Sequence, residues 1–172
     1  LIPRYLHFII AALAIGGLGR AIFYRFSRID EQDKAFQVKR NLKIFGWLTL
    51  VQFVVGTWFW LTMPEPVWKQ FMGQHVAGTI LMFMGWIGAF LILHAAFTNK
   101  FSFAMFLGIH QVLVMVLIRD ISRRAYLESH FEPNQLETVH ELSPLFVFLL
   151  VFLAGALVIY YMIRLSNKPK TL

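Results

Sequence analysis

The sequence predicts an all-α integral membrane protein with five transmembrane helices. Of its 172 residues 58% are hydrophobic, against about 45–50% in soluble domains, and the mean hydropathy is +0.63. The apolar residues gather in five stretches, each near the ~20 residues that a helix needs to cross the hydrocarbon core of a bilayer. These stretches are Tyr5–Phe26, Ile44–Met63, Val76–Phe97, Phe101–Ile118 and Pro144–Ile163.

The domain organisation follows from where polar residues interrupt these stretches. We expect one transmembrane domain over residues 1–172, in which the first four helices form a haem-binding bundle (1–128) and the fifth helix (140–165) is peripheral. The fifth stretch holds no charged residue and no histidine, which is typical of a helix that faces lipid or a partner. The chain has no cysteine, which excludes disulfides, iron–sulfur clusters and covalent c-type haem attachment.

The positive charges predict the orientation. Basic residues crowd the segment between the first two stretches and the tail after the last, and they favour the cytoplasmic side of an inner membrane. They are Arg25, Arg28, Lys34, Lys39, Arg40 and Lys43, then Arg164, Lys168 and Lys170. The N-terminus is therefore expected outside and the C-terminus in the cytoplasm. The tight turn Thr98-Asn99-Lys100 then lies inside, while Met63–Gln74 and Arg119–Ser143 lie outside.

Four histidines lie within or at the ends of the predicted spans, where ionisable residues are costly and often functional. His7 is in the first span, His75 and His94 are at the two ends of the third, and His110 is in the fourth. Histidines on several helices of one bundle favour haem b, because two imidazoles can ligate one iron from opposite faces. We expect one or two haems.

Depth in the membrane suggests how the histidines pair. At ~1.5 Å per residue, His7 and His75 match near the outer side, whereas His94 and His110 differ by about 9 Å. Met105 lies closer in depth to His94, so a His–Met site is an alternative. His110 matches Gln52 in depth, which leaves three further readings for it: a second outer haem, a quinone, or a hydrogen bond to Gln52. Interhelical hydrogen bonding without any cofactor is the structural alternative for all four histidines.

Other polar residues are candidates for the surroundings of a cofactor. Gln52 is the strongly polar residue inside the second span, and we place it among the cofactor-binding residues. Arg20 is either a charge partner of a haem propionate or a side chain that snorkels to the inner surface. Arg119 and Arg123 are candidate propionate partners of an outer haem, with a solvated cluster at the end of the helix as the alternative.

Two segments carry a family resemblance. They are Arg4-Tyr5-Leu6-His7-Phe8 in the first span, and Lys43-Ile44-Phe45-Gly46 followed by Phe53, Gly56, Thr62 and Met63 in the second. Over roughly the first half, the chain resembles the N-terminal quinol-oxidising bundle of cytochrome bd oxidase subunit I and the shorter bd-like b-type cytochromes. The resemblance implies that His7 is a haem b ligand, that quinol is oxidised, and that electrons pass to a partner such as a multihaem c-type cytochrome. The chain is much shorter than subunit I and lacks a long quinol-binding loop, which puts an oxygen-reducing site in doubt.

The sequence therefore predicts a membrane b-type cytochrome subunit of a quinol:cytochrome-type oxidoreductase, which transfers electrons between the quinone pool and an outer-side redox partner. The outer segment Arg119–Ser143 is expected to help form a quinone pocket or to dock the partner through its mixed charges. The alternative is a cofactor-free structural anchor subunit of a larger complex. A transporter component is a weaker hypothesis, because no Asp or Glu lies inside the five predicted spans.

Overall fold

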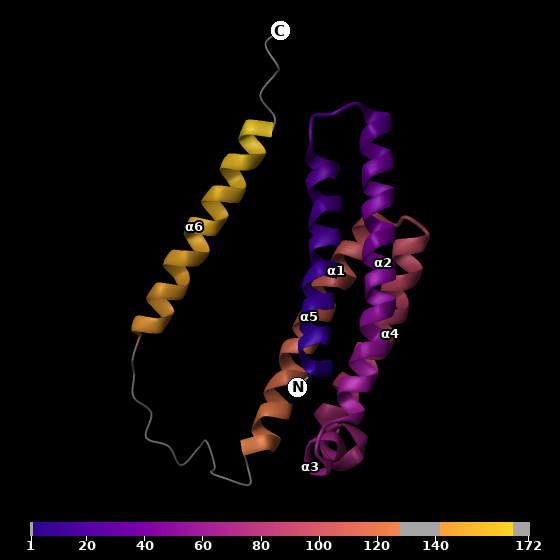
Figure 1. Cartoon of the computed structure of the whole chain (residues 1–172), viewed down its shortest axis with the longest axis vertical. Coiled ribbons are helices and arrows are strands. Elements are labelled where there is room, and N and C mark those ends of the chain that lie inside the picture. The colour runs from indigo at the N-terminus through magenta and orange to yellow at the C-terminus, as the bar shows by residue number, and fades with distance from the viewer. Residues whose placement is uncertain (1, 128–141, 167–172) are drawn as a thin grey trace.

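A computed structural model describes residues 2–127 and 142–166, and the regular structure in those ranges is entirely helical (Figure 1). In chain order the elements are α1 (Ile2–Phe26), α2 (Glu31–Leu61), α3 (Glu65–Lys69), η1 (Gln70–Gln74), α4 (Val76–Phe97), α5 (Phe101–Leu127) and α6 (Ser143–Ser166). Five of these helices, namely α1, α2, α4, α5 and α6, are long and apolar enough to cross a membrane. The prediction of an all-helical, multi-pass membrane protein is thus confirmed at this level.

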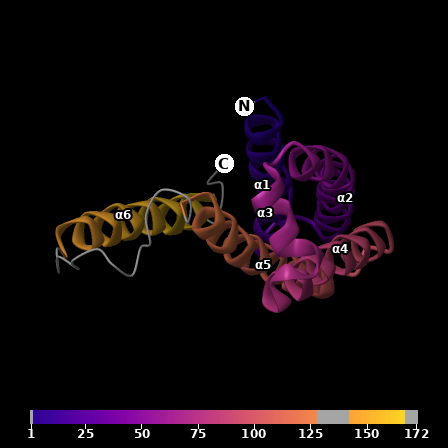
Figure 2. The same ribbon diagram turned by 90° about the horizontal axis from the view of Figure 1, so that it is seen from below.

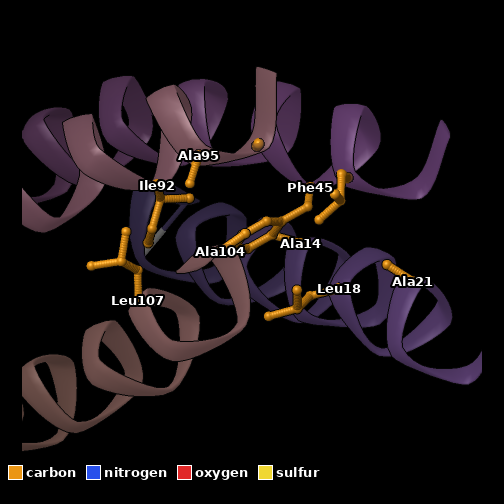
Figure 3. Close-up of a cluster of buried hydrophobic side chains, with 10 residues drawn as sticks. Ala14, Leu18, Ala21, Phe45, Ile92, Ala95, Ala104 and Leu107 are labelled. Carbon is orange, nitrogen blue, oxygen red and sulfur yellow. The ribbon is translucent and has the colours of Figure 1, made fainter. Parts of the chain in front are cut away.

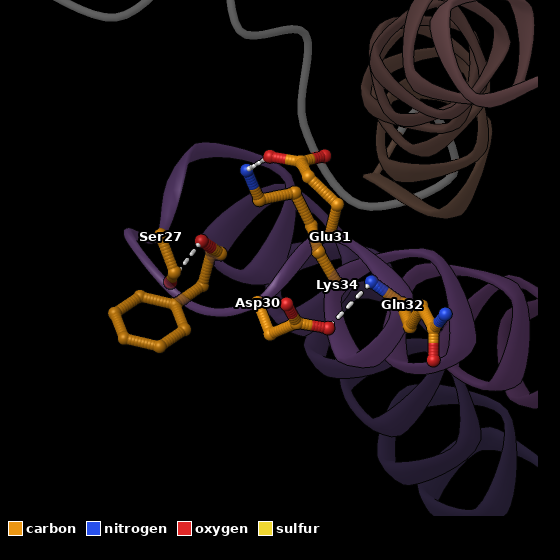
Figure 4. Close-up of polar contacts among 6 residues, drawn as sticks. Ser27, Asp30, Glu31, Gln32 and Lys34 are labelled. Atoms are coloured by element: carbon orange, nitrogen blue, oxygen red, sulfur yellow. Dashed lines mark hydrogen bonds and ion pairs between the residues drawn. The ribbon is translucent and has the colours of Figure 1, made fainter.

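Helix α2 extends well beyond the apolar run that predicts it. That run starts at Ile44, but the helix already begins at Glu31, because Asp30 caps it. The Asp30 carboxylate accepts a hydrogen bond of 3.0 Å from the Gln32 backbone N–H, and Glu31 pairs with Lys34 at 2.6 Å (Figure 4). Acidic residues in the first turn also suit the positive end of the helix dipole. The basic segment between the first two spans is therefore largely helical.

The connection between α2 and α4 consists of the two short helices α3 and η1. In α3, Lys69 pairs with Glu65 one turn earlier, and its hydrogen bond and positive charge hold the pKa of Glu65 below the ordinary value. The chain then turns at Gly73, whose φ of 103° is a conformation that favours glycine. The Gly73 N–H donates to the Thr79 hydroxyl at 2.9 Å, which fixes this turn against the first residues of α4.

A tight turn joins α4 to α5, as the sequence predicts for Thr98-Asn99-Lys100. Asn99 adopts a φ of 57°, which asparagine tolerates better than most residues with a side chain. The following helix runs to Leu127, past the end of its apolar run at Ile118. Its extra turns carry charged side chains, so α5 projects out of the apolar layer at the end remote from the turn.

The core lies where α1, α2, α4 and α5 meet, and half of its buried residues are alanines (Figure 3). Its buried members are Ala14, Leu18, Ala21, Leu42, Phe45, Ile92, Ala95, Ala96, Ala104 and Leu107. Alanines and glycines allow close backbone approach, which is how membrane helices associate when lipid removes the hydrophobic driving force between them. Helix α1 packs mainly on α2, and α4 packs on both α2 and α5.

Helix α6 stands apart from the other helices in Figure 1, and Figure 2 shows that it extends to one side of the bundle. All of its side chains that the structure describes are exposed, and none belongs to the core. Its surface is almost uniformly apolar, as expected of a helix surrounded by lipid or by another membrane subunit.

Candidate functional site

The most polar buried point between the spans is a contact between α1 and α2. His7 is half-buried in α1, and its Nε2 lies 3.1 Å from Nε2 of Gln52, a side chain that is only 6% exposed. The His7 ring also faces Phe59, with 5.9 Å between ring centroids. A histidine and a glutamine from two helices are therefore paired within an otherwise apolar layer.

A glycine makes room for this pair. A Cβ at Gly56 would lie 2.9 Å from Cε1 and 3.1 Å from Nδ1 of His7, closer than ordinary van der Waals contact. Gly56 lies one helical turn after Gln52, so both residues face the imidazole of His7. The ring contacts the backbone of Gly56 and the side-chain amide of Gln52. Gln52 and Gly56 of α2 thus form the surface against which His7 packs, which we call the seat of His7.

Three buried polar atoms near this seat have no partner: Nδ1 of His7, Oε1 of Gln52 and Nε1 of Trp60. At 100° per residue, Gln52, Gly56 and Trp60 share one side of α2. Whichever way the Gln52 amide is turned, one hydrogen-bond donor and one acceptor of the His–Gln pair remain free. Unsatisfied polar atoms are costly in an apolar environment, and for this reason the cluster is the candidate functional site.

His75 has a different local role. It is the N-cap of α4, and its Nδ1 accepts a hydrogen bond of 3.0 Å from the Gly78 backbone N–H. A neutral imidazole that accepts at Nδ1 carries its proton on Nε2. To ligate iron through Nε2, His75 would have to give up this cap.

The two remaining histidines are not brought together. His94 is exposed in the last turn of α4, and His110 is half-buried in α5, where it stacks on Phe106 with 6.4 Å between ring centroids. In the described part of the chain, no hydrogen bond or ring contact joins two of the four histidines. Met105, the alternative partner of His94, is half-buried in the first turns of α5.

One depth-based interpretation is wrong. His110 and Gln52 were matched for a hydrogen bond, but the amide of Gln52 points to His7 instead. The reason is helix packing: α1 lies along α2, whereas α5 has far less contact with α2. Equal depth along two helices does not place two side chains on facing sides.

The candidate arginines lie on the surface. Arg20 is exposed in the C-terminal half of α1, and Arg119 and Arg123 are exposed near the end of α5. Arg124, not these two, pairs with Asp120 at 2.9 Å. An open pocket of about 550 Å³ between the ends of α4 and α5 is lined by His75, Asp120, Arg124 and apolar side chains. Residues 128–141 of the expected outer docking segment lie outside the described residues.

Two polar residues of the bundle are missing from the sequence-based candidates. Gln111 donates a hydrogen bond of 3.1 Å to the Gly85 carbonyl and so ties α5 to α4. Its position as a polar residue inside an apolar stretch could have identified it from the sequence. Trp60 is half-buried against Trp86, with 6.3 Å between ring centroids. Nothing in the sequence alone separates it from the other tryptophans.

The surroundings of His7 can be compared with those that a haem-ligating histidine requires. Such an imidazole presents one nitrogen to the iron, while a hydrogen bond at the other nitrogen fixes the ring. In His7, Nε2 lies 3.1 Å from Nε2 of Gln52, and Nδ1 is buried without a partner on the side of the ring that faces Gly56, so the ring would have to turn before Nδ1 could meet an iron. Among the described residues, no group of three His, Asp or Glu side chains is placed to hold a bare metal ion. Comparisons of the chain with protein-family models, curated proteins and solved structures find no match.

Proposed function

We propose that the chain is a b-type haem membrane subunit that exchanges electrons between the quinone pool and a redox partner on the outer side of an inner membrane. One observation carries this proposal. His7 is a partly buried intramembrane histidine with one nitrogen held by Gln52 and the other nitrogen unpartnered. The resemblance of the His7 segment to the bd-type quinol-oxidising bundle supports the same reading.

The roles of the residues follow from this arrangement. Bound haem would supply one-electron transfer, and His7 would hold it from α1. Gln52 fixes the orientation of the His7 ring, and Gly56, which has no side chain, leaves room for the ring itself. Of the other three histidines, His75 is already used as a helix cap, so holding the haem with His75 as well would cost that hydrogen bond. Exposed Arg20, Arg119 and Arg123 are available to propionates that reach the surface.

The quinone and the partner belong to the same proposal. The free hydrogen-bonding atoms of Gln52 and Trp60 complement the carbonyl and hydroxyl groups of a quinone or quinol head group. The distribution of basic residues favours an orientation with His7 toward the outer side, where an external c-type cytochrome would dock. Electrons would thus leave on the outer side of the membrane, near the N-terminal end of α1.

The decisive experiment is a dithionite-reduced minus oxidised visible spectrum of the purified chain, combined with a pyridine haemochrome assay. The expected result is a b-type alpha band and one or two haems per chain. A flat spectrum from protein that was produced with ample haem would overturn the proposal.

A second candidate function, a cofactor-free membrane anchor, is favoured by a different observation. The described side chains of α6 are all exposed, so this helix is free to dock another subunit. In this case the His7–Gln52 contact is an interhelical hydrogen bond and nothing more. Such bonds contribute about 0.6 kcal/mol on average in membranes.

A double-mutant cycle separates the two functions. We expect Gln52→Leu to lower haem affinity by about 10- to 100-fold, because it removes the group that orients the ligand. The stability of the haem-free protein should change little, with a His7–Gln52 coupling below ~2 kcal/mol. If the chain is a cofactor-free anchor, the cycle should show the His7–Gln52 coupling in the free energy of unfolding but no haem binding to lose. Unfolding in detergent and haem titration of the same four proteins supply both readings.

A further inference from the structure

A second pocket lies at the opposite end of the bundle from His7. It opens between the end of α1, the start of α2 and the start of α5, and its volume is about 600 Å³. It is lined by Arg25, Glu31, Lys34, Ala35, Val38, Lys39, Asn99, Lys100, Phe101, Ser102 and Phe103. Segments that are far apart in the sequence thus combine into one site, which the proposed electron transfer does not use.

The polar wall of this pocket is strongly basic. Arg25, Lys34, Lys39 and Lys100 face a single acid, Glu31, which leaves three positive charges in excess. Only Lys34 is paired with this acid, at 2.6 Å (Figure 4). The first turn of α5 forms another wall and has no acidic residue, so the positive end of its helix dipole adds to the attraction for an anion.

The other wall is apolar and borders the membrane. Val38, Phe101 and Phe103 line it, and Phe103 is 41% exposed. Arg25 lies in the last turn of α1, and Lys100 directly precedes α5, so the pocket is level with the ends of two candidate spans. Phospholipid head groups occupy this level of a bilayer. The pocket therefore offers cations to a phosphate and an apolar edge to the acyl chains of the same molecule.

We infer that this pocket binds the head group of an anionic phospholipid, with the phosphate between Arg25, Lys39 and Lys100 and the acyl chains along Phe103. Basic pockets between transmembrane helices are suited to such head groups. A bound lipid would contact both the α1–α2 hairpin and the α4–α5 hairpin, beside the core that already joins them. The inference holds whether or not the chain carries haem.

The test measures lipid binding to the purified full chain by native mass spectrometry. Phosphatidylglycerol and phosphatidylcholine of the same chain length are titrated separately. We expect phosphatidylglycerol to bind at least about tenfold more tightly. The variant Lys39→Gln/Lys100→Gln should lose roughly 25-fold in that affinity, and Arg25→Gln alone about fivefold, which corresponds to ~1 kcal/mol per charge near the membrane surface.

A matched control removes the same charge from the same end of the bundle. Arg40 and Lys43 are exposed on α2 but do not line the pocket, so Arg40→Gln/Lys43→Gln should keep the affinity within about twofold. All variants should melt at the wild-type temperature in lipid-free detergent. Equal loss in the control pair would show general attraction to basic residues and overturn the pocket.

Two further outcomes would also overturn the inference. One is equal binding of the two lipids by the wild-type chain. The other is complete displacement of phosphatidylglycerol by millimolar inorganic phosphate, which would identify a site for a free anion. Retention of the lipid in phosphate, together with its loss in the pocket variants, supports the phospholipid as the ligand.

Discussion

Replacing His7 by alanine is expected to abolish the haem that the proposed function assigns to the outer half of the bundle. The imidazole is the group that α2 seats between Gln52 and bare backbone at Gly56, and alanine leaves no nitrogen there. The pyridine haemochrome assay should show one haem fewer per chain, which is a complete loss of the alpha band if the chain holds a single haem. Unchanged haem content would remove His7 from the site.

The control is a variant that loosens the bundle without touching the proposed ligand. Gln111→Leu removes the hydrogen bond between α5 and the Gly85 carbonyl in α4, and it should leave the haem content unchanged. His7→Gly with added imidazole provides a second reading, because a free imidazole can occupy the vacated seat. Return of the band with imidazole indicates ligation, whereas loss of haem in Gln111→Leu would indicate that any loosening releases it.

The number of spans could be predicted from sequence because each apolar run is long and is bounded by charges or a turn. The start of α2 could not, because its first turns are polar and depend on the Asp30 cap. Hydropathy detects where a helix is apolar, not where it begins. The extension of α5 beyond Ile118 was hidden for the same reason.

The candidate site was predictable in part. An intramembrane histidine such as His7 stands out from sequence alone, since its presence in an apolar run needs a cause. Its partner Gln52 could not be identified in the same way, because an estimate of depth takes no account of how the helices are rotated and how they cross. The basic pocket could not be predicted from the sequence either. Arg25, Lys39 and Lys100 lie far apart in the chain, and only the packing of their helices brings them to one pocket.

A large loss of stability is expected on substitution of Gly108, where α5 crosses α1. A Cβ there would lie 2.6 Å from Cδ2 of Leu18 and 3.5 Å from Cζ of Phe45, and both of these side chains are buried in the core. Gly108→Leu should therefore destabilise the bundle by about 3 kcal/mol, at the upper end of the range for overpacked cores. Chemical unfolding in detergent, followed by circular dichroism, measures this change.

The matched control for Gly108 is another helical glycine of the same bundle. Gly19 in α1 is exposed, and a Cβ there would meet no atom within 4 Å. Gly19→Leu should leave the free energy of unfolding within about 0.5 kcal/mol of the wild-type value, because it adds surface only toward lipid. If both variants unfold alike, leucine itself rather than the α1–α5 crossing is the cause. If only Gly108→Leu is unstable, the close approach of α5 to Leu18 is what holds the two hairpins together. The His7 site would then depend on this crossing indirectly, because His7 and Leu18 both belong to α1.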